Sequence, residues 1–257
     1  MEKTRIEWAN SSWNPVSGCR HTCPYCYARG TANRFKGCDL SPDGSTDQEL
    51  VVLKERLKVT GKDGTIRNAS YPYGFIPTFH EYRLNDPSTK GFGKTIFVCS
   101  MADLFGEWIP DEWITKVFDA CKAAEGHRYL FLTKNPERYI KLRESGLLPT
   151  GDSFWYGATV TDDTSPIMWA KDLHTFASIE PILGPLCNEN TPGELGYIDW
   201  FIIGAETGNR KDKVIPKREW IEDVVNYARK HGKPVFMKDS LKPIWGEDII
   251  TELPWSD

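Results

Sequence analysis

Three cysteines close together in the chain have the spacing that most directly suggests chemistry. Cys19, Cys23 and Cys26 lie within eight residues, and Gly18 and Pro24 favour a turning loop over a helix or a strand. A loop this short can wrap three thiolates around one small object. Thiolates are the usual ligands of iron–sulfur clusters and of zinc, so the spacing predicts a metal site.

The number of ligands distinguishes two kinds of site. Three cysteines are one short of a closed tetrahedral zinc site, which would need a fourth ligand such as Cys38 or His21. In a [4Fe–4S] cluster, three cysteines leave one iron open, and an open metal position is where a substrate or cofactor binds. The loop favours the cluster, and a zinc-stabilised nucleic-acid-binding module stays open as the alternative.

A repeated pattern of short apolar runs must position this loop. The runs are rich in β-branched and aromatic residues and nearly continuous, which fits parallel strands buried on both faces. They cover Thr95–Cys99, Tyr129–Leu132, Trp155–Val160, Phe176–Ile179, Trp200–Ile203 and Pro234–Met237. Weaker strand candidates lie at Ser12–Val16 and Phe75–Phe79.

Helical patterns alternate with some of these runs. One apolar face begins at Ile114, a helix start lies at Asn135-Pro136-Glu137 with Gly146 as its stop, and another face begins at Trp220 and ends near Gly232. Strand–helix alternation predicts an α/β fold, a complete or partial (β/α) barrel with parallel strands. An open doubly wound sheet is the alternative. The connections at 181–197 and 82–93 look poor in helix.

The chain is expected to form a single domain over residues 1–257 with an insertion at 36–72. That segment is rich in Gly, Asp and Ser, and it contains one possible helix. Thr46 and Glu49 would form a capping box, and Leu50, Leu53 and Leu57 would form the apolar stripe. The segment is interpreted equally as a lid over the site or as a surface decoration.

Polar residues follow most of the expected strands. Ligands of parallel α/β folds bind at the carboxyl ends of the strands, so these residues are site candidates. They are Ser100, Asp103, Thr133, Lys134, Thr159, Thr161, Glu180, Glu206, Lys238 and Asp239. Glu180 and Glu206 would also suit the carboxylate pair of a barrel hydrolase, but that interpretation leaves the cysteine loop unexplained. Cys99 and Cys121 lie in apolar runs and are expected in the core.

The cysteine spacing, with Tyr25 just before the last cysteine, resembles the signature of the radical S-adenosylmethionine (SAM) superfamily. Further stretches resemble the phage-associated three-Cys-motif family of radical-SAM-like proteins. These stretches are Ile6–Pro15, Phe97–Phe105, Leu132–Arg138, Glu180–Leu186 and Ile203–Glu206. The resemblance runs from about Thr4 to Lys238 and is weakest over 36–72.

The resemblance implies a radical SAM barrel, a [4Fe–4S] cluster held by Cys19, Cys23 and Cys26, and SAM on the open iron. An electron from a reductant such as flavodoxin would cleave SAM, and the resulting 5′-deoxyadenosyl radical would abstract a hydrogen atom. The implied cofactor-binding residues are Tyr25, Ser100, Asp103, Lys134, Thr159, Glu180 and Glu206. The superfamily's Gly-Gly-Glu stretch is not obvious, and Phe79-His80-Glu81 lies nearest to its expected place.

A basic stretch after the Trp200–Ile203 run suggests the substrate. Arg210 and Lys211 begin this stretch, and they and Lys238 would contact phosphates while Trp13 stacks on a base. The alternative interpretation of the stretch is a solvated, charged loop without a binding role. The phage association favours modification or isomerisation of a thymine base or its substituent in DNA, which requires base flipping, and a free nucleotide or a peptide substrate is also open.

Bulk composition fits an ordinary globular protein. The 257 residues are 40% hydrophobic and 26% charged, with a net charge of −4. No apolar run is long enough to span a bilayer, and the N-terminus lacks the apolar region of a signal peptide. We therefore expect no membrane partner and a cytoplasmic protein, in the host cytoplasm if a phage encodes it.

Overall fold

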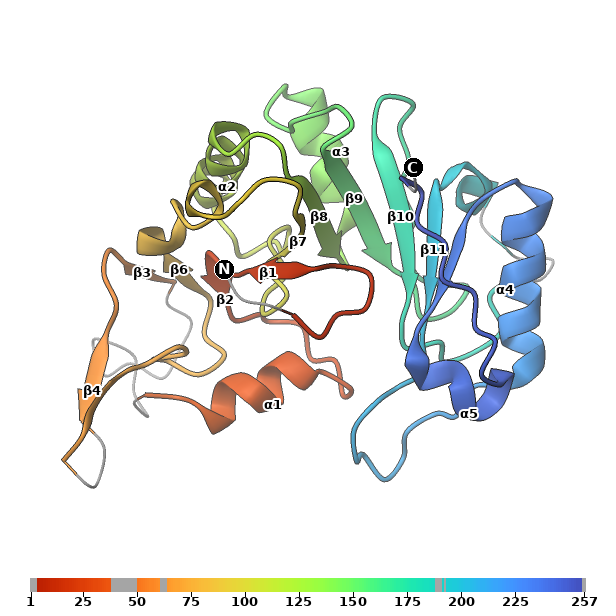
Figure 1. Ribbon diagram of the computed structural model, residues 1–257, viewed down its shortest axis with the longest axis horizontal. Helices are drawn as coiled ribbons and strands as arrows, with labels where there is room; N and C mark the ends of the chain where they lie inside the picture. The colour runs from red at the N-terminus through yellow and green to blue at the C-terminus, as the bar shows by residue number, and fades with distance from the viewer. Residues whose placement is uncertain (1–3, 38–49, 61–63, 188–190, 192, 256–257) are drawn as a thin grey trace. The chain divides into compact units, whose positions relative to one another are not determined.

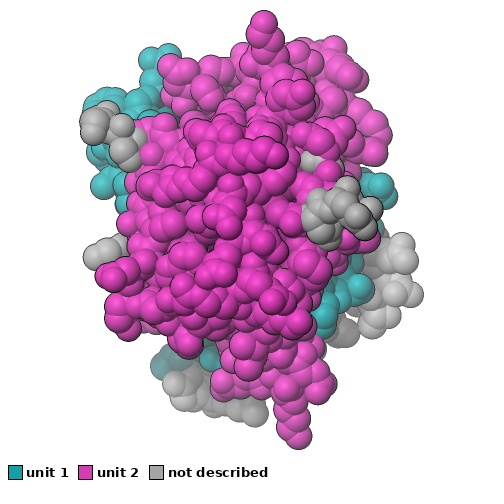
Figure 2. All heavy atoms as spheres, turned by 90° about the vertical axis from the view of Figure 1, so that its right-hand side faces the viewer, with its two compact units in different colours: residues 1–4, 9–129 teal, residues 5–8, 130–257 magenta. Residues whose placement is uncertain are grey.

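The computed structural model describes residues 4–37, 50–60, 64–187, 191 and 193–255. Contacts within the chain divide it into two compact units, coloured separately in Figure 2. Unit 1 contains Met1–Thr4 and Ala9–Tyr129, and unit 2 contains Arg5–Trp8 and Leu130–Asp257. The single domain expected from the sequence stays a prediction.

The largest sheet has seven strands in the hydrogen-bonded order β1-β7-β8-β9-β10-β11-β12 (Figure 1). The pairs β1–β7, β9–β10, β10–β11 and β11–β12 are all parallel. The strands are β1 (Ser11–Trp13), β7 (Thr95–Val98), β8 (Arg128–Thr133), β9 (Phe154–Thr159), β10 (His174–Ile179), β11 (Trp200–Ile203) and β12 (Val235–Met237). Among the described strands, β1 and β12 end the order, so these strands do not close into a complete barrel.

The expected apolar runs all form strands of this sheet. Every residue of β7, β11 and β12 is buried, as near-continuous apolar strands require. The prediction of a mixed α/β fold with a parallel sheet is therefore confirmed. The weak candidate at Ser12–Val16 is divided, because Asn14-Pro15 separates β1 from β2 (Val16–Ser17).

Unit 1 adds two small sheets. β2, β6 (Thr78–His80) and β3 (Val51–Leu53) form one, and β4 (Lys58–Thr60) pairs with β5 (Ile66–Asn68). Its helices are α1 (Tyr27–Arg34) and α2 (Asp111–Ala123), with 3-10 turns η1 (Glu81–Arg83) and η2 (Pro87–Thr89).

The helix expected around Leu50, Leu53 and Leu57 is wrong in its described part. Residues 51–53 form β3, whose Val51 is buried and aligned with Thr78 of β6. Two adjacent valines favour a strand, and pairing with a neighbouring strand outweighs the leucine spacing. The capping residues Thr46 and Glu49 lie outside the described residues.

Unit 2 contains α3 (Pro136–Glu144), η3 (Gly193–Tyr197), α4 (Arg218–Lys230), η4 (Asp239–Leu241) and α5 (Lys242–Trp245). The helix start at Asn135 and the stops at Gly146 and Gly232 are confirmed, and both glycines have positive φ. The connections at 82–93 and 181–197 were expected to be poor in helix, and in their described parts the helical structure is limited to 3-10 turns.

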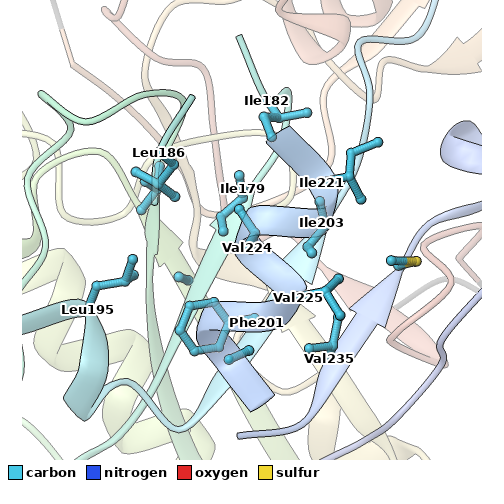
Figure 3. Packing of buried hydrophobic residues seen from close by; sticks show 14 of the residues in the cluster. Ile179, Ile182, Leu186, Leu195, Phe201, Ile203, Ile221, Val224, Val225 and Val235 are labelled. Carbon is cyan, nitrogen blue, oxygen red and sulfur yellow. The ribbon is translucent and has the colours of Figure 1, made fainter. Parts of the chain in front are cut away.

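Unit 2 has its own apolar core between α4 and the strands (Figure 3). Ile221, Val224 and Val225 of α4 pack with Phe201 of β11 and Val235 of β12. This packing holds the carboxyl ends of the strands in a fixed arrangement. None of the described helices is both long and apolar enough to cross a membrane.

Candidate metal centre and strand-end residues

The cysteine loop begins at a glycine that no other residue could replace without strain. Gly18 has φ +87°, and a Cβ atom there would lie 2.3 Å from the carbonyl oxygen of Ile76. Its amide donates to the Met101 carbonyl at 2.9 Å, and the Cys19 amide donates to the Phe75 carbonyl at 3.2 Å. Two neighbouring segments therefore hold the backbone at the first cysteine.

The loop ends in a turn that leads into a helix. The Cys26 amide donates to the Cys23 carbonyl at 3.3 Å, and Cys26 is the N-cap residue of α1. Its Sγ accepts a hydrogen bond from the Arg29 amide at 3.3 Å. The last cysteine therefore takes the capping role that a short polar side chain usually fills.

Burial and nearby groups set the electrostatic environment of the first thiol of the loop. Each of the three thiols is free and partly buried. Burial raises the pKa of Cys19 to about 12, a hydrogen bond from the His21 amide lowers it, and the proximity of Asp103, Cys23 and Cys26 raises it. A thiol in this setting becomes a thiolate when a metal supplies the compensating charge.

The donor set fits both a cluster with an open iron and a zinc ion with a fourth ligand. Within the ranges that the structure describes, no three His, Cys, Asp or Glu side chains form a ready-made site for one metal ion. Metal binding commonly orders its ligands as it occurs, so this arrangement selects neither group.

Asp103 holds a histidine of the loop. The His21 Nε2 lies 2.9 Å from the Asp103 Oδ2, and the His21 ring meets the edge of Trp108 at 4.9 Å between centroids. Asp103 is buried, and its Oδ1 also accepts from the Phe105 amide at 3.0 Å. Asp103 was predicted to bind a cofactor, and the structure shows it orienting His21.

The turn after β7 lies against the loop. Ser100, a predicted cofactor-binding residue, accepts a hydrogen bond from the Tyr27 hydroxyl on its carbonyl oxygen at 2.8 Å. Cys99 has φ +58°, a left-handed conformation that is uncommon for a residue other than glycine. Sequence reasoning placed Cys99 in the core, which is confirmed, but it did not find the strained turn.

Sequence reasoning also missed Asn14, which links β1 to this turn. The Asn14 Oδ1 accepts from the Ser100 hydroxyl at 3.1 Å and from the Met101 amide at 3.0 Å. The signal available in the sequence was its position between a buried strand and Pro15.

Two aromatic residues of the predicted site have different surroundings. Trp13 is completely buried and donates to the Arg83 carbonyl at 2.8 Å, so the prediction that it stacks on a base does not fit the structure. A ring inside the core has no face left for a substrate. Tyr25 is partly buried in the cysteine loop.

In unit 2, two predicted residues form an ion pair at the carboxyl ends of β10 and β12, on either side of β11. Ile179, Ile203 and Met237 are aligned in β10, β11 and β12, so Glu180, Gly204 and Lys238 follow in register. The Lys238 ammonium donates to the Glu180 carboxylate. A Cβ on Gly204 would lie 3.1 Å from the Lys238 Cδ and 3.2 Å from the Glu180 Cδ, so the pair spans the middle strand over a glycine.

Glu206 forms a second ion pair. Its side chain is 1% exposed, and the Arg210 guanidinium donates to both carboxylate oxygens at 2.7 Å. The hydrogen bonds from Arg210 lower the pKa of Glu206. A glycosidase needs an acid with a raised pKa, so this arrangement argues against Glu206 as the acid of a carboxylate hydrolase.

The remaining predicted residues are spread along unit 2. Lys134 follows β8 and lies near the Asp162 carboxylate, and Thr159 ends β9 beside Ser178. Lys211 is exposed.

The basic stretch has ion pairs of its own. Arg210 contacts Glu206, Lys217 contacts Glu219 and Arg218 contacts Glu222. Several of its basic side chains are therefore paired with nearby carboxylates.

The model of one protein family, described as "Protein of unknown function (DUF5131)", matches residues 3–249. No curated protein and no solved structure matches the chain.

Proposed function

The chain belongs to the DUF5131 family, and we propose that it is an iron–sulfur enzyme of the radical SAM type. In this proposal Cys19, Cys23 and Cys26 hold a [4Fe–4S] cluster. The observation that carries the proposal is a set of three free thiols on one short loop. The Gly18 and Cys19 amides at the start of this loop are hydrogen-bonded to neighbouring segments. When bound, the cluster would present an open iron to SAM and supply the electron for its reductive cleavage.

The chain's own residues would support this chemistry in defined ways. Burial around Cys19 limits water near the first ligand, and the N-cap position of Cys26 fixes the last ligand at the start of α1. The Glu180–Lys238 pair offers a carboxylate and an ammonium at partly exposed strand ends. Lys238 stays a substrate-binding candidate. Glu180 stays a cofactor-binding candidate on the sequence resemblance, with Tyr25, Ser100, Asp103, Lys134, Thr159 and Glu206.

The proposed substrate is a nucleic-acid base or its substituent, in DNA or in a nucleotide. Lys211 is exposed beside the Glu206–Arg210 pair, which leaves it available to a phosphate. A flavodoxin-like protein would supply the electron. These substrate and partner assignments extend the sequence resemblance.

Anaerobic purification followed by iron, sulfide and zinc analysis tests the proposal. We expect about four irons and four sulfides per chain in the wild-type protein, as a [4Fe–4S] cluster requires. Cys23→Ser should lose them. Cys187→Ser is the matched control, because Cys187 is also free and partly buried but lies outside the loop, and it should keep the full amount.

One observation favours a second candidate, a zinc site in a nucleic-acid-binding module. A carboxylate that orients a histidine is common around zinc, and Asp103 orients His21 in this way. His21 would then be the fourth ligand through its Nδ1. One zinc per chain without iron, lost in His21→Ala, would support this candidate over the cluster.

A further inference from the structure

We propose that Asn14 is a positioning residue that fixes both ends of the cysteine loop, and with them the geometry of the metal centre. The inference rests on the proposed metal centre and goes beyond it, because Asn14 would bind neither metal nor cofactor. It would act through the turn Cys99–Ala102. All the contacts that carry it lie within unit 1.

The first step runs from Asn14 to the first cysteine. The Asn14 Oδ1 accepts from the Met101 amide at 3.0 Å, and the Met101 carbonyl accepts from the Gly18 amide at 2.9 Å. Gly18 also forms a parallel bridge with Ala102 and directly precedes Cys19. The side chain of Asn14 is therefore linked to the backbone at Cys19 through Met101.

The second step runs from Asn14 to the last cysteine. The Ser100 hydroxyl donates to the Asn14 Oδ1 at 3.1 Å, and the Ser100 carbonyl accepts from the Tyr27 hydroxyl at 2.8 Å. Tyr27 is the first residue of α1, directly after Cys26. One amide oxygen therefore holds the two residues to which both ends of the loop are attached.

The strained backbone explains why the turn needs such support. The left-handed conformation of Cys99, with φ +58°, costs free energy and persists only where surrounding contacts fix it. The Cys99 amide donates to the Trp13 carbonyl at 2.8 Å, and the two bonds to Asn14 follow at the next two residues. Without the amide oxygen, the turn would lose two of these restraints.

The test uses the full chain with Asn14→Ala, Asn14→Asp and a matched control. Asn10→Ala is the control because the Asn10 Oδ1 accepts from the Thr95 amide at 3.0 Å, which is a similar bond at the other end of the β1–β7 pair. A merely structural role for Asn14 predicts equal effects of the two alanine variants. A positioning role predicts that only Asn14→Ala changes the loop.

Hydrogen exchange of the metal-free chain gives the first readout. Two lost hydrogen bonds should speed exchange of the Gly18 and Cys19 amides about tenfold or more in Asn14→Ala, with the amides of β9–β12 unchanged. Asn14→Asp keeps both acceptor bonds and should restore protection. Unchanged exchange at Gly18 and Cys19 in Asn14→Ala would overturn the inference, whatever metal the protein binds.

Reconstitution with iron and sulfide gives the second readout. Asn14→Ala should retain the cluster about tenfold less well against a chelator than the wild type and Asn10→Ala. Asn14→Asp should load fully and show a lower midpoint potential, because it adds a negative charge at a residue that contacts the turn holding the loop. If the wild type loads iron and Asn14→Ala retains it equally well, the inference fails while the proposed function stands. A wild type that binds no iron contradicts the proposed function instead.

Discussion

At the scale of single residues, His80 is a buried polar side chain that supports the start of the cysteine loop. It is completely buried, its Nε2 lies 2.8 Å from the Ser17 hydroxyl, and its Nδ1 lies 3.3 Å from the Tyr82 hydroxyl. Ser17 directly precedes Gly18, so this network supports the start of the cysteine loop. The neighbouring Glu81 pairs with Lys116 at 3.0 Å.

His80 predicts how stability depends on pH. Burial, and then the charge of Arg83, lower its pKa to about 3 from 6.5. Above about pH 6.5 the imidazole is neutral in both the folded and unfolded chain. As the pH falls from 6.5 toward 3, the unfolded chain binds a proton that the folded chain does not. The free energy of unfolding should then fall by up to about 1.4 kcal/mol for each unit that the pH is lowered.

The variant His80→Gln removes this titration and keeps a group that can bond to Ser17. Urea unfolding at pH 7 and pH 5 should show a smaller loss of stability for this variant than for the wild type. Asn10→Ala removes no titrating group, so it serves as the control and should keep the wild-type pH dependence. Equal losses in His80→Gln and the wild type would refute the assignment.

Residue types and spacing are enough to propose the metal ligands, but not the residues that hold the loop. The three cysteines stand out as proposed ligands because ligand chemistry depends on local spacing. Asn14 and His80 could not, because their roles come from partners 86 and 63 residues away, Ser100 and Ser17. Nothing in the local pattern distinguishes such residues from a turn asparagine or a core histidine.

At the scale of elements, the register of β10, β11 and β12 explains the Glu180–Lys238 pair. The two charged residues follow β10 and β12, and the absence of a side chain at Gly204, which follows β11 between them, leaves the space that their side chains use. The pair is therefore a product of strand alignment and one glycine.

Gly204→Ala should disrupt this pair. The new methyl group would lie 3.1 Å and 3.2 Å from the two side chains, and overpacking of this kind costs about 1–3 kcal/mol. Thermal or urea unfolding measures the loss. Gly184→Ala is the matched control, since its Cβ would meet nothing within 4 Å and should change stability by about 1 kcal/mol at most. Equal stability of the two variants would contradict the close packing at Gly204.

The elements differ in how well their sequences specify them. The buried strands were predictable because burial on both faces requires near-continuous apolar runs, and α4 was predictable because its buried face repeats with the helical period. β3 was not, because its three residues depend on pairing with β6 and the leucine spacing around them imitates a helix. Short strands carry too few residues for a period to be distinct.

At the scale of the whole molecule, the cluster assignment is the claim on which the proposed chemistry depends. Membership of the DUF5131 family places the chain among its relatives without stating a reaction. The fold contributes a parallel sheet whose strand ends carry paired charges, and the loop contributes three thiols. The proposed reaction is therefore tested on the protein reconstituted with its cluster.

The most direct measurement is the electron paramagnetic resonance spectrum of the anaerobically reconstituted and reduced protein, recorded with and without SAM. We predict the signal of a reduced [4Fe–4S] cluster that changes when SAM is added, because three cysteine ligands leave one iron open to it. Cys23→Ser should show no such signal. A protein that carries zinc and no iron, or a cluster signal that SAM leaves unchanged, would contradict the account.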